Sequence, residues 1–257
     1  MKSNRLPVAF IGHGSPMNII ADNDYTRDIT DYARHIGKPS TIVVISAHWV
    51  THGTYITGAG KPGQIYDFYG FPESLYRINY SPKGKPTVAD QITSIVDDIR
   101  IDERRGIDHA AWSIAKHMFP AADIPLLEIS LDVTLSPREH FERAKKLAQL
   151  RNKSILFIGS GNLVHNLRDI SFDDPVEPFQ WAIDFDMILK KMIDTDSIDQ
   201  LIDYEQLPHA ARSIPTNEHY LPLLYVLGMK HENERLNIIH ESIQNGSISM
   251  RSFDYSL

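Results

Sequence analysis

The sequence predicts an α/β protein with a mixed central β-sheet and helices on both faces. The first observation is the run Thr41–Val50, whose first five residues are all β-branched and which carries no charged side chain. A continuous apolar run of this kind is typical of a strand that is covered on both faces. The second observation is that residues 7–11 and 154–158 form two more such runs. The third is that amphipathic segments alternate with these runs, as they do in α/β folds.

Composition limits the classes of protein to which this chain can belong. It has 257 residues, which suffice for one domain with a full core, so we expect a single domain over residues 1–257. The formal net charge is −7 and no long basic run occurs, which argues against a nucleic-acid partner. There is no cysteine, so a transition-metal site would have to use His, Asp or Glu.

The cellular location is predicted from the lack of a signal peptide and of a membrane-spanning segment. The N-terminal residues lack the apolar core of a signal peptide. No apolar run reaches the ~18 to 20 residues of a membrane span. We therefore expect a cytoplasmic protein without a membrane partner.

The first half of the chain predicts three helices and three strands. Residues 24–36 repeat apolar side chains at helical spacing and end before Gly37. Strands are expected at residues 7–11, 41–50 and 55–57, and further helices at 87–98 and at about 104–118. Between them, residues 58–84 form a long segment rich in Gly, Pro and aromatic residues. A loop of this length in a compact domain is usually functional.

The second half predicts a similar alternation. Residues 125–131 and 154–159 read as strands, and Ser136 and Glu139 resemble a capping box that starts a helix to residue 150. An amphipathic segment follows at 177–201, then a connector at 207–215. A helix is expected over 216–227, closed by Gly228. Two terminal strands are expected at 238–240 and 247–255, around a turn at 244–246.

Histidines stand where these expected elements end. His13, His48 and His165 follow or finish three buried strands, and His109, His209 and His219 lie at other junctions. Ligands of open α/β sheets bind outside the carboxyl ends of strands, so we expect several of these rings at one edge. Neutral imidazole suits iron and zinc, and three protein ligands with open positions mark a catalytic site.

Six motifs in order resemble a known family. They are Gly12–Pro16, Ser46–Trp49, Ile65–Pro72, Asp108–Trp112, Gly159–His165 and Glu218–Leu223. Together they are similar to the DOPA-dioxygenase branch of the class III extradiol ring-cleavage dioxygenases, within the LigB-like superfamily. The resemblance runs from residue 8 to about 252. One departure is Ala110, where the family often has Gly.

The resemblance implies a mononuclear, non-haem Fe(II) that holds a catechol through both hydroxyl oxygens and binds O2 beside it. His13, His48 and His219 would be metal ligands. His165 would be the acid–base residue next to them, and His109 would contact the substrate or the oxygen. The implied partners are a small aromatic diol of the DOPA type and O2, and a purified protein is expected to accept Zn(II) as well.

Several alternatives stay open at this point. Glu218 adjoins His219 and could take its place as the third ligand, and His165 could be a fourth ligand if the ion is zinc. Tyr66 and Asp67 could line the opening of the pocket. His209 and Arg212 could hold a substrate carboxylate, because Arg binds carboxylates through two parallel hydrogen bonds.

Two other functions compete with ring cleavage. A zinc-dependent hydrolase could use the same histidines without O2. A Memo-like interaction protein shares the fold and binds partners without turning over a catechol, and fold alone does not decide between these functions. The sequence leaves the oligomeric state open.

Overall fold

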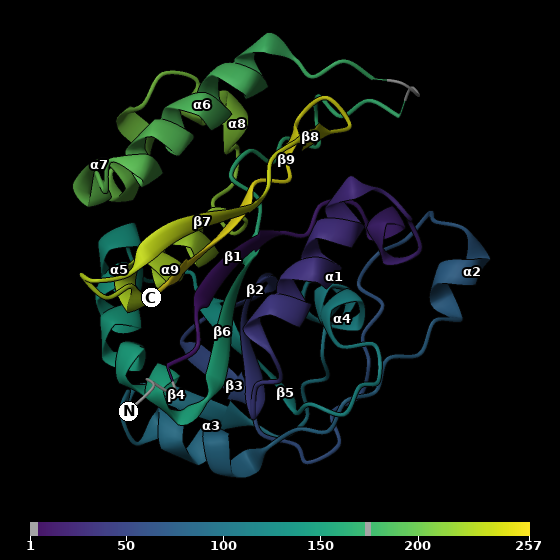
Figure 1. Ribbon diagram of the computed structural model, residues 1–257, viewed down its shortest axis with the longest axis vertical. Coiled ribbons are helices and arrows are strands. Elements are labelled where there is room, and N and C mark those ends of the chain that lie inside the picture. Colours follow the sequence, from purple (N-terminus) through teal and green to yellow (C-terminus); the bar gives the residue numbers. More distant parts are fainter. Residues whose placement is uncertain (1–4, 173–175) are drawn as a thin grey trace.

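The computed structural model describes residues 5–172 and 176–257, and an eight-stranded sheet runs through the middle of the molecule (Figure 1). The strand order is β4-β3-β5-β2-β6-β1-β10-β7. Its strands are β1 (Val8–Gly12), β2 (Thr41–Thr51), β3 (Thr54–Thr57), β4 (Ile99–Asp102), β5 (Leu126–Asp132), β6 (Ile155–Gly161), β7 (Arg235–His240) and β10 (Ser252–Ser256). A separate two-stranded sheet pairs β8 (Ile243–Gln244) with β9 (Ile248–Ser249).

The central part of the sheet is parallel. β1, β6, β2 and β5 pair in parallel, and these are the strands that the apolar runs predicted. Antiparallel pairing occurs toward the edges, where β10 joins β1 and β7, and where β3 joins β5. The predicted mixed α/β sheet is therefore confirmed.

Helices cover both faces of this sheet, as expected. Alternate residues of β1 divide between the two cores: Val8 and Phe10 face one, Ala9 and Ile11 the other. The first core packs against α3 (Pro86–Thr93), α5 (Pro137–Leu147), α6 (Gln180–Asp194), α7 (Ile198–Ile202) and α9 (Leu221–Met229). The second packs against α1 (Asp24–Ile36) and α4 (His109–Met118), seen on the other side of the sheet in Figure 1.

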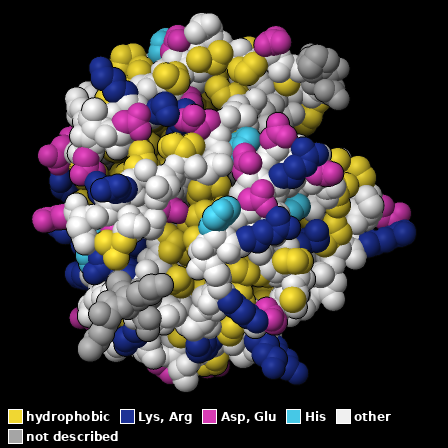
Figure 2. Space-filling model, viewed as in Figure 1, with side chains coloured by type: hydrophobic (Ala, Val, Ile, Leu, Met, Phe, Trp, Pro, Cys, Tyr) yellow, Lys and Arg dark blue, Asp and Glu magenta, His cyan; other side chains and the backbone are white. Residues whose placement is uncertain are grey.

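None of the helices in the described residues is long and apolar enough to cross a membrane. Short helical turns complete the fold. The remaining elements are η1 (Pro16–Ile19), α2 (Glu73–Tyr76), η2 (Ala148–Lys153), η3 (Tyr204–Gln206) and α8 (Ala210–Ser213). Side chains of both signs are interspersed on the face shown in Figure 2.

Helix starts with side-chain caps match the predictions best. α1 has the predicted bounds and opens on a capping box from Asn23, and α5 opens on the predicted box between Ser136 and Glu139. Three helices are shorter than predicted. α4 begins at His109 rather than at about residue 104. α3 ends at Thr93 rather than residue 98, and α5 passes into the 3-10 turn η2 at Ala148.

The prediction was wrong in two places near the C-terminus. The helix expected from residue 216 begins only at Leu221, where Pro222 occupies its first turn, and Gly228 lies inside it. His219 therefore lies in a turn before the helix. The turn at 244–246 joins the short strands β8 and β9, while β10 returns to the main sheet beside β7.

Candidate metal centre

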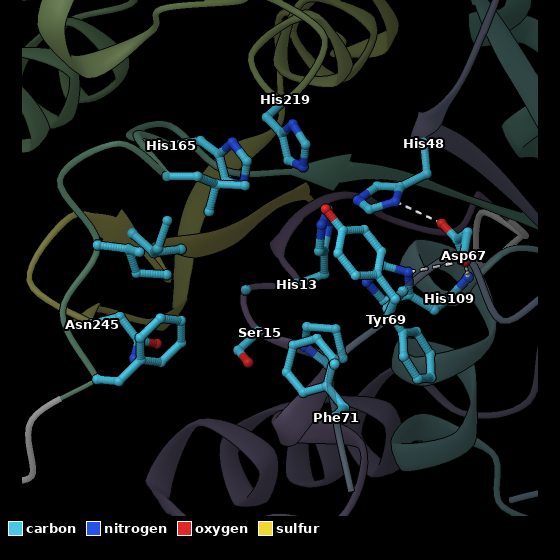
Figure 3. A pocket seen from close by; sticks show the side chains of 18 residues that line it. His13, Ser15, His48, Asp67, Tyr69, Phe71, His109, His165, His219 and Asn245 are labelled. Atoms are coloured by element: carbon cyan, nitrogen blue, oxygen red, sulfur yellow. Dashed lines mark hydrogen bonds and ion pairs between the residues drawn. The ribbon is translucent and has the colours of Figure 1, made fainter. Parts of the chain in front are cut away.

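Three histidines from distant parts of the chain meet at the carboxyl ends of the central strands. The ring centroids of His13, His48 and His219 are 5.0, 5.1 and 5.2 Å apart, so the rings form a nearly equilateral triangle (Figure 3). One ring nitrogen from each lies within 4.8 Å of the other two. Three imidazoles this close together could hold one metal ion.

His13 is held by the residues on either side of it and by β6. Its backbone N–H donates to the carbonyl of Gly161, and Gly14 adopts a φ of +60°, which favours glycine. The hydroxyl of Ser160 donates to the carbonyl of Ala110 at 2.6 Å, so it can only accept from His13 Nδ1 at 3.0 Å. Ser160 thereby fixes the proton on Nδ1 and leaves Nε2 of His13 as an acceptor.

His48 lies in an irregular stretch of β2, where the register against β5 shifts between Ile45 and Val50. Such bulges re-aim side chains next to functional sites. Nδ1 of His48 lies 2.6 Å from the Asp67 carboxylate, whereas Nε2 is buried and has no hydrogen-bond partner among the described residues. A buried imidazole nitrogen without a partner calls for an explanation, and a metal ion supplies one.

His219 reaches the triangle because two glycines in β6 let its backbone approach. A Cβ at Gly161 would lie 2.0 Å from the carbonyl oxygen of His219, and one at Gly159 would lie 2.5 Å from that of Pro222. Nδ1 of His219 contacts Glu218 at 3.1 Å. In all three histidines, then, a neighbouring side chain occupies Nδ1 and Nε2 is left for a ligand, the usual arrangement around a bound metal.

Two further histidines flank the triangle. The ring of His165 stacks on that of His219, with centroids 3.5 Å apart and planes 8° from parallel. The ring of His109 lies 4.3 Å from that of His48, and its backbone N–H donates to Asp67 at 2.9 Å. His109 Nδ1 is also 3.0 Å from the Asp67 carboxylate, so this one acidic residue contacts two histidines.

Comparison with known proteins assigns the chain that carries this histidine cluster to a family. Residues 8–252 match the family model described as the catalytic LigB subunit of aromatic ring-opening dioxygenase. The chain belongs to this family.

Curated relatives and a solved structure agree with this assignment. The chain is 40% identical to a 4,5-DOPA dioxygenase extradiol of Escherichia coli (strain K12), over 98% of this chain and 95% of that one. It is 33% identical to a 4,5-DOPA dioxygenase extradiol of Beta vulgaris, over 96% and 95% of the two chains. A crystal structure of an uncharacterized protein from Escherichia coli K12 superposes with a TM-score of 0.86 at 36% identity, covering 98% of this chain and all of that one. The predicted enzyme class, an extradiol ring-cleaving dioxygenase, is confirmed.

Burial keeps four of the five histidines that form this site in the neutral state. It lowers the pKa of His13 and of His219 well below the usual value, and each is lowered further by the neighbouring histidines. Burial also lowers the pKa of His165 to about 4 and depresses that of His109. These four rings are neutral at pH 7, the form that can bind a metal or accept a proton.

His48 and Asp67 behave differently because they contact each other. Burial opposes the His48 cation, but the hydrogen bond to Asp67 and the nearby carboxylates raise the pKa of His48 overall. Burial likewise opposes ionisation of Asp67, but its contacts with His109 and His48 hold the pKa of Asp67 far below its usual value. Asp67 is therefore an anion beside the candidate metal centre.

A second layer of buried polar groups lies behind His48. The hydroxyl of Ser46 donates to Asp108 at 2.9 Å and accepts the backbone N–H of His48 at 3.1 Å. Asp108 also pairs with Arg105, and its backbone N–H donates to Glu128 at 2.7 Å. Burial and the Asp108 charge raise the pKa of Glu128. Sequence reasoning missed this layer, although an acidic residue inside the apolar run 125–131 was a visible sign of it.

The cavity in front of the triangle has a volume of about 440 Å³, and all five histidines line it. Phe68, Tyr69 and Phe71 of the long loop also line it, as does Asp67. Tyr66 does not, since its hydroxyl donates to the carbonyl of Ile78 at 2.7 Å.

The residues expected to hold a substrate carboxylate also lie elsewhere. Arg212 pairs with Asp169 at 2.8 Å, and its guanidinium lies over the ring of Trp181. His209 is exposed at the start of α8 and does not contact the cavity. The structure thus brings together six of the predicted site residues and leaves Tyr66, His209 and Arg212 outside.

Proposed function

We propose that this enzyme cleaves the aromatic ring of a small catechol, such as DOPA, with O2 and a resident Fe(II). The observation that carries the proposal is the triangle of His13, His48 and His219, in which each Nδ1 is occupied and each Nε2 is available. Three neutral protein ligands would leave open positions for substrate. Bound Fe(II) would hold both catechol oxygens and O2 and carry electrons between them.

The donor set fits such an ion. The rings of His13 and His219 are neutral at pH 7, and that of His48 can bind an ion once it gives up its proton. The sequence has no cysteine, and Nε2 of His48 is a buried acceptor without a partner among the described residues. The same donors suit Zn(II), which lies above Fe(II) in general affinity order, so the metal in the purified protein depends on supply.

We assign His165 as the base that takes a proton from a catechol hydroxyl. Its pKa of about 4 keeps the ring neutral at pH 7, and its position on the face of His219 puts it beside the proposed ion. The protonated ring can later return that proton to the reacting oxygen. His109 would donate a hydrogen bond to substrate or oxygen, held in place by Asp67 and by the ring of Phe68, whose centroid is 5.3 Å away.

The test is anaerobic reconstitution with Fe(II), followed by addition of a catechol and air. Oxygen uptake and a yellow muconic-semialdehyde-type product are expected, and both should be lost in His48→Ala. The exposed His52→Ala is a matched control from the same strand end and should keep both. A metal-loaded protein that consumes no oxygen with any catechol would overturn the proposal, and turnover of an ester without oxygen by the zinc form would instead favour the hydrolase.

A further inference from the structure

The cavity has two chemically different ends. At one end the histidine triangle, His109 and Asp67 supply nitrogen and carboxylate atoms for the reacting diol. The other end lies next to Asn245, which is seen across Ser15 from Asp67 in Figure 3. Asn245 and Ser171 exchange two hydrogen bonds, which fix the segment 167–172 at this second end.

This second end is apolar and open to water. Leu167, Ile170 and Phe172 of the fixed segment line it, together with Ile248. Leu167 is 59% exposed and Phe172 77% exposed, so neither is there to fill the core. Exposed apolar side chains gathered at the mouth of a cavity mark a surface that binds an apolar group.

Positive charge is missing from this end. No lysine or arginine is found among the described residues that line the cavity. Arg212 is engaged with Asp169 and Trp181, and Arg168, although next to Leu167 in sequence, does not line the cavity. The polar side chains that line this end are those of Ser15 and Asn245, and one N–H of the Asn245 amide donates to the carbonyl of Ser171.

A carboxylate on the substrate would therefore lose water without gaining a cation. Burying an ionised group without a partner is strongly unfavourable. The carboxylate of Asp67 lines the same cavity and adds repulsion between like charges. An apolar substituent has neither cost and gains contact with Leu167, Ile170 and Phe172.

Resting on the proposed function, we propose that this dioxygenase selects catechols whose ring substituent is apolar and uncharged over catechols that carry a carboxylate, DOPA included. The residues that impose this selection are Leu167, Ile170 and Phe172. The selection acts on the substituent, while the diol is held at the histidine end.

The test compares two substrates of matched length, 4-propylcatechol and 3-(3,4-dihydroxyphenyl)propionate, which differ in the terminal carboxylate. With the Fe(II) enzyme in air, kcat/KM for the propylcatechol should exceed that for the propionate and for DOPA by at least tenfold. Equal or greater kcat/KM for the propionate or for DOPA would overturn the inference.

A binding measurement separates this inference from the proposed function. Isothermal titration of the Zn(II)-loaded protein under nitrogen should give a Kd for 4-propylcatechol at least tenfold below that for the propionate. If no catechol is turned over but this ratio holds, the proposed function fails and the selectivity stands. Equal Kd values would overturn the selectivity even where ring cleavage is observed.

Variants at the mouth identify the residues responsible. Leu167→Arg places a cation at the apolar end and should reduce the preference for the propylcatechol at least tenfold. Leu167→Gln, which removes one apolar contact but adds no charge, should reduce that preference by less than tenfold. Arg168→Gln and Arg212→Gln should leave kcat/KM for the propionate unchanged. A selective loss of propionate turnover in either arginine variant would show that a cation serves the carboxylate, and the inference would be wrong.

Discussion

Nδ1 of His48 lies 2.6 Å from a carboxylate oxygen of Asp67, and each side chain is only 20% exposed. The carboxylate also accepts the backbone N–H of His109, so one anion fixes the orientation of two rings of the site. Partners of this kind orient a ligand and set which of its nitrogens carries the proton.

Asp67→Asn should weaken metal binding by about 10–100-fold, the usual effect of removing a partner behind a metal ligand. The amide can no longer hold the proton on Nδ1 of His48 by charge. Metal affinity can be measured by competition with a chromophoric chelator. Asp22→Asn, an exposed residue paired with Arg27, is the control and should bind metal as the wild type does. An unchanged affinity in Asp67→Asn would show that Asp67 does not support a ligand.

His165 and His219 have stacked rings but should have different functions, one as a proton acceptor and the other as a metal ligand. His219→Gln should lose the metal, because it removes one corner of the triangle. His165→Gln should keep the metal and lower kcat for ring cleavage by about 10²–10⁴-fold, the range for removal of a general acid or base. Metal content per chain and kcat report on both variants. Loss of metal in His165→Gln would instead make His165 a ligand.

Much of the fold could be predicted because its signals are local. Buried parallel strands appear as unbroken apolar runs, and the boxes at Asn23 and Ser136 start helices through contacts within four residues. The start of α9 was misplaced because polar residues at 216–219 read as a cap. There the close approach to Gly159 and Gly161, which is a tertiary contact, sets the backbone instead.

The site was predictable to the extent that strand ends converge. His13 follows β1 and His48 lies near the end of β2, and both strands pair in parallel with β6, so their meeting follows from topology. What Asp67 and Arg212 contact does not follow, because Asp67 lies in an irregular loop and Arg212 in the short helix α8, and packing decides the path of both. Arg212 contacts the carboxylate of Asp169 and the ring of Trp181, and it does not line the cavity.

A buried ion pair far from the cavity should dominate the stability of one edge of the fold. Arg151 is fully buried, contacts both carboxylate oxygens of Glu234, and also donates to the backbone carbonyls of Leu6, Met229 and Tyr255. Arg151→Met leaves the buried carboxylate of Glu234 with the longer contact to Arg5 at 3.9 Å, and it should cost about 3–5 kcal/mol in the free energy of unfolding. Arg138→Met removes an exposed pair with Asp199 and should cost less than about 1 kcal/mol. Urea unfolding of the metal-free protein distinguishes them, and similar losses in the two variants would contradict this account.

Acid should destabilise the protein partly through His140, a buried residue of α5 whose Nδ1 lies 3.1 Å from the hydroxyl of Tyr225. Burial lowers the pKa of His140 to about 4 in the folded state, against about 6.5 in an unfolded chain. Between these two values the unfolded chain binds a proton that the folded protein does not, so stability falls as the pH drops from about 6.5 to about 4 and then levels off.

His140→Gln removes this one titration. The variant should be less stable than the wild type at pH 7.5, and the gap should narrow by about 2–3 kcal/mol at pH 4.5, because the wild type alone loses the contribution of this ring. Urea unfolding of the metal-free proteins across this range measures the gap. Tyr225→Phe removes the hydroxyl but keeps the buried imidazole, so its stability should follow the pH dependence of the wild type. A constant gap between His140→Gln and the wild type would mean that the folded protein accepts the proton at His140 as readily as the unfolded chain does.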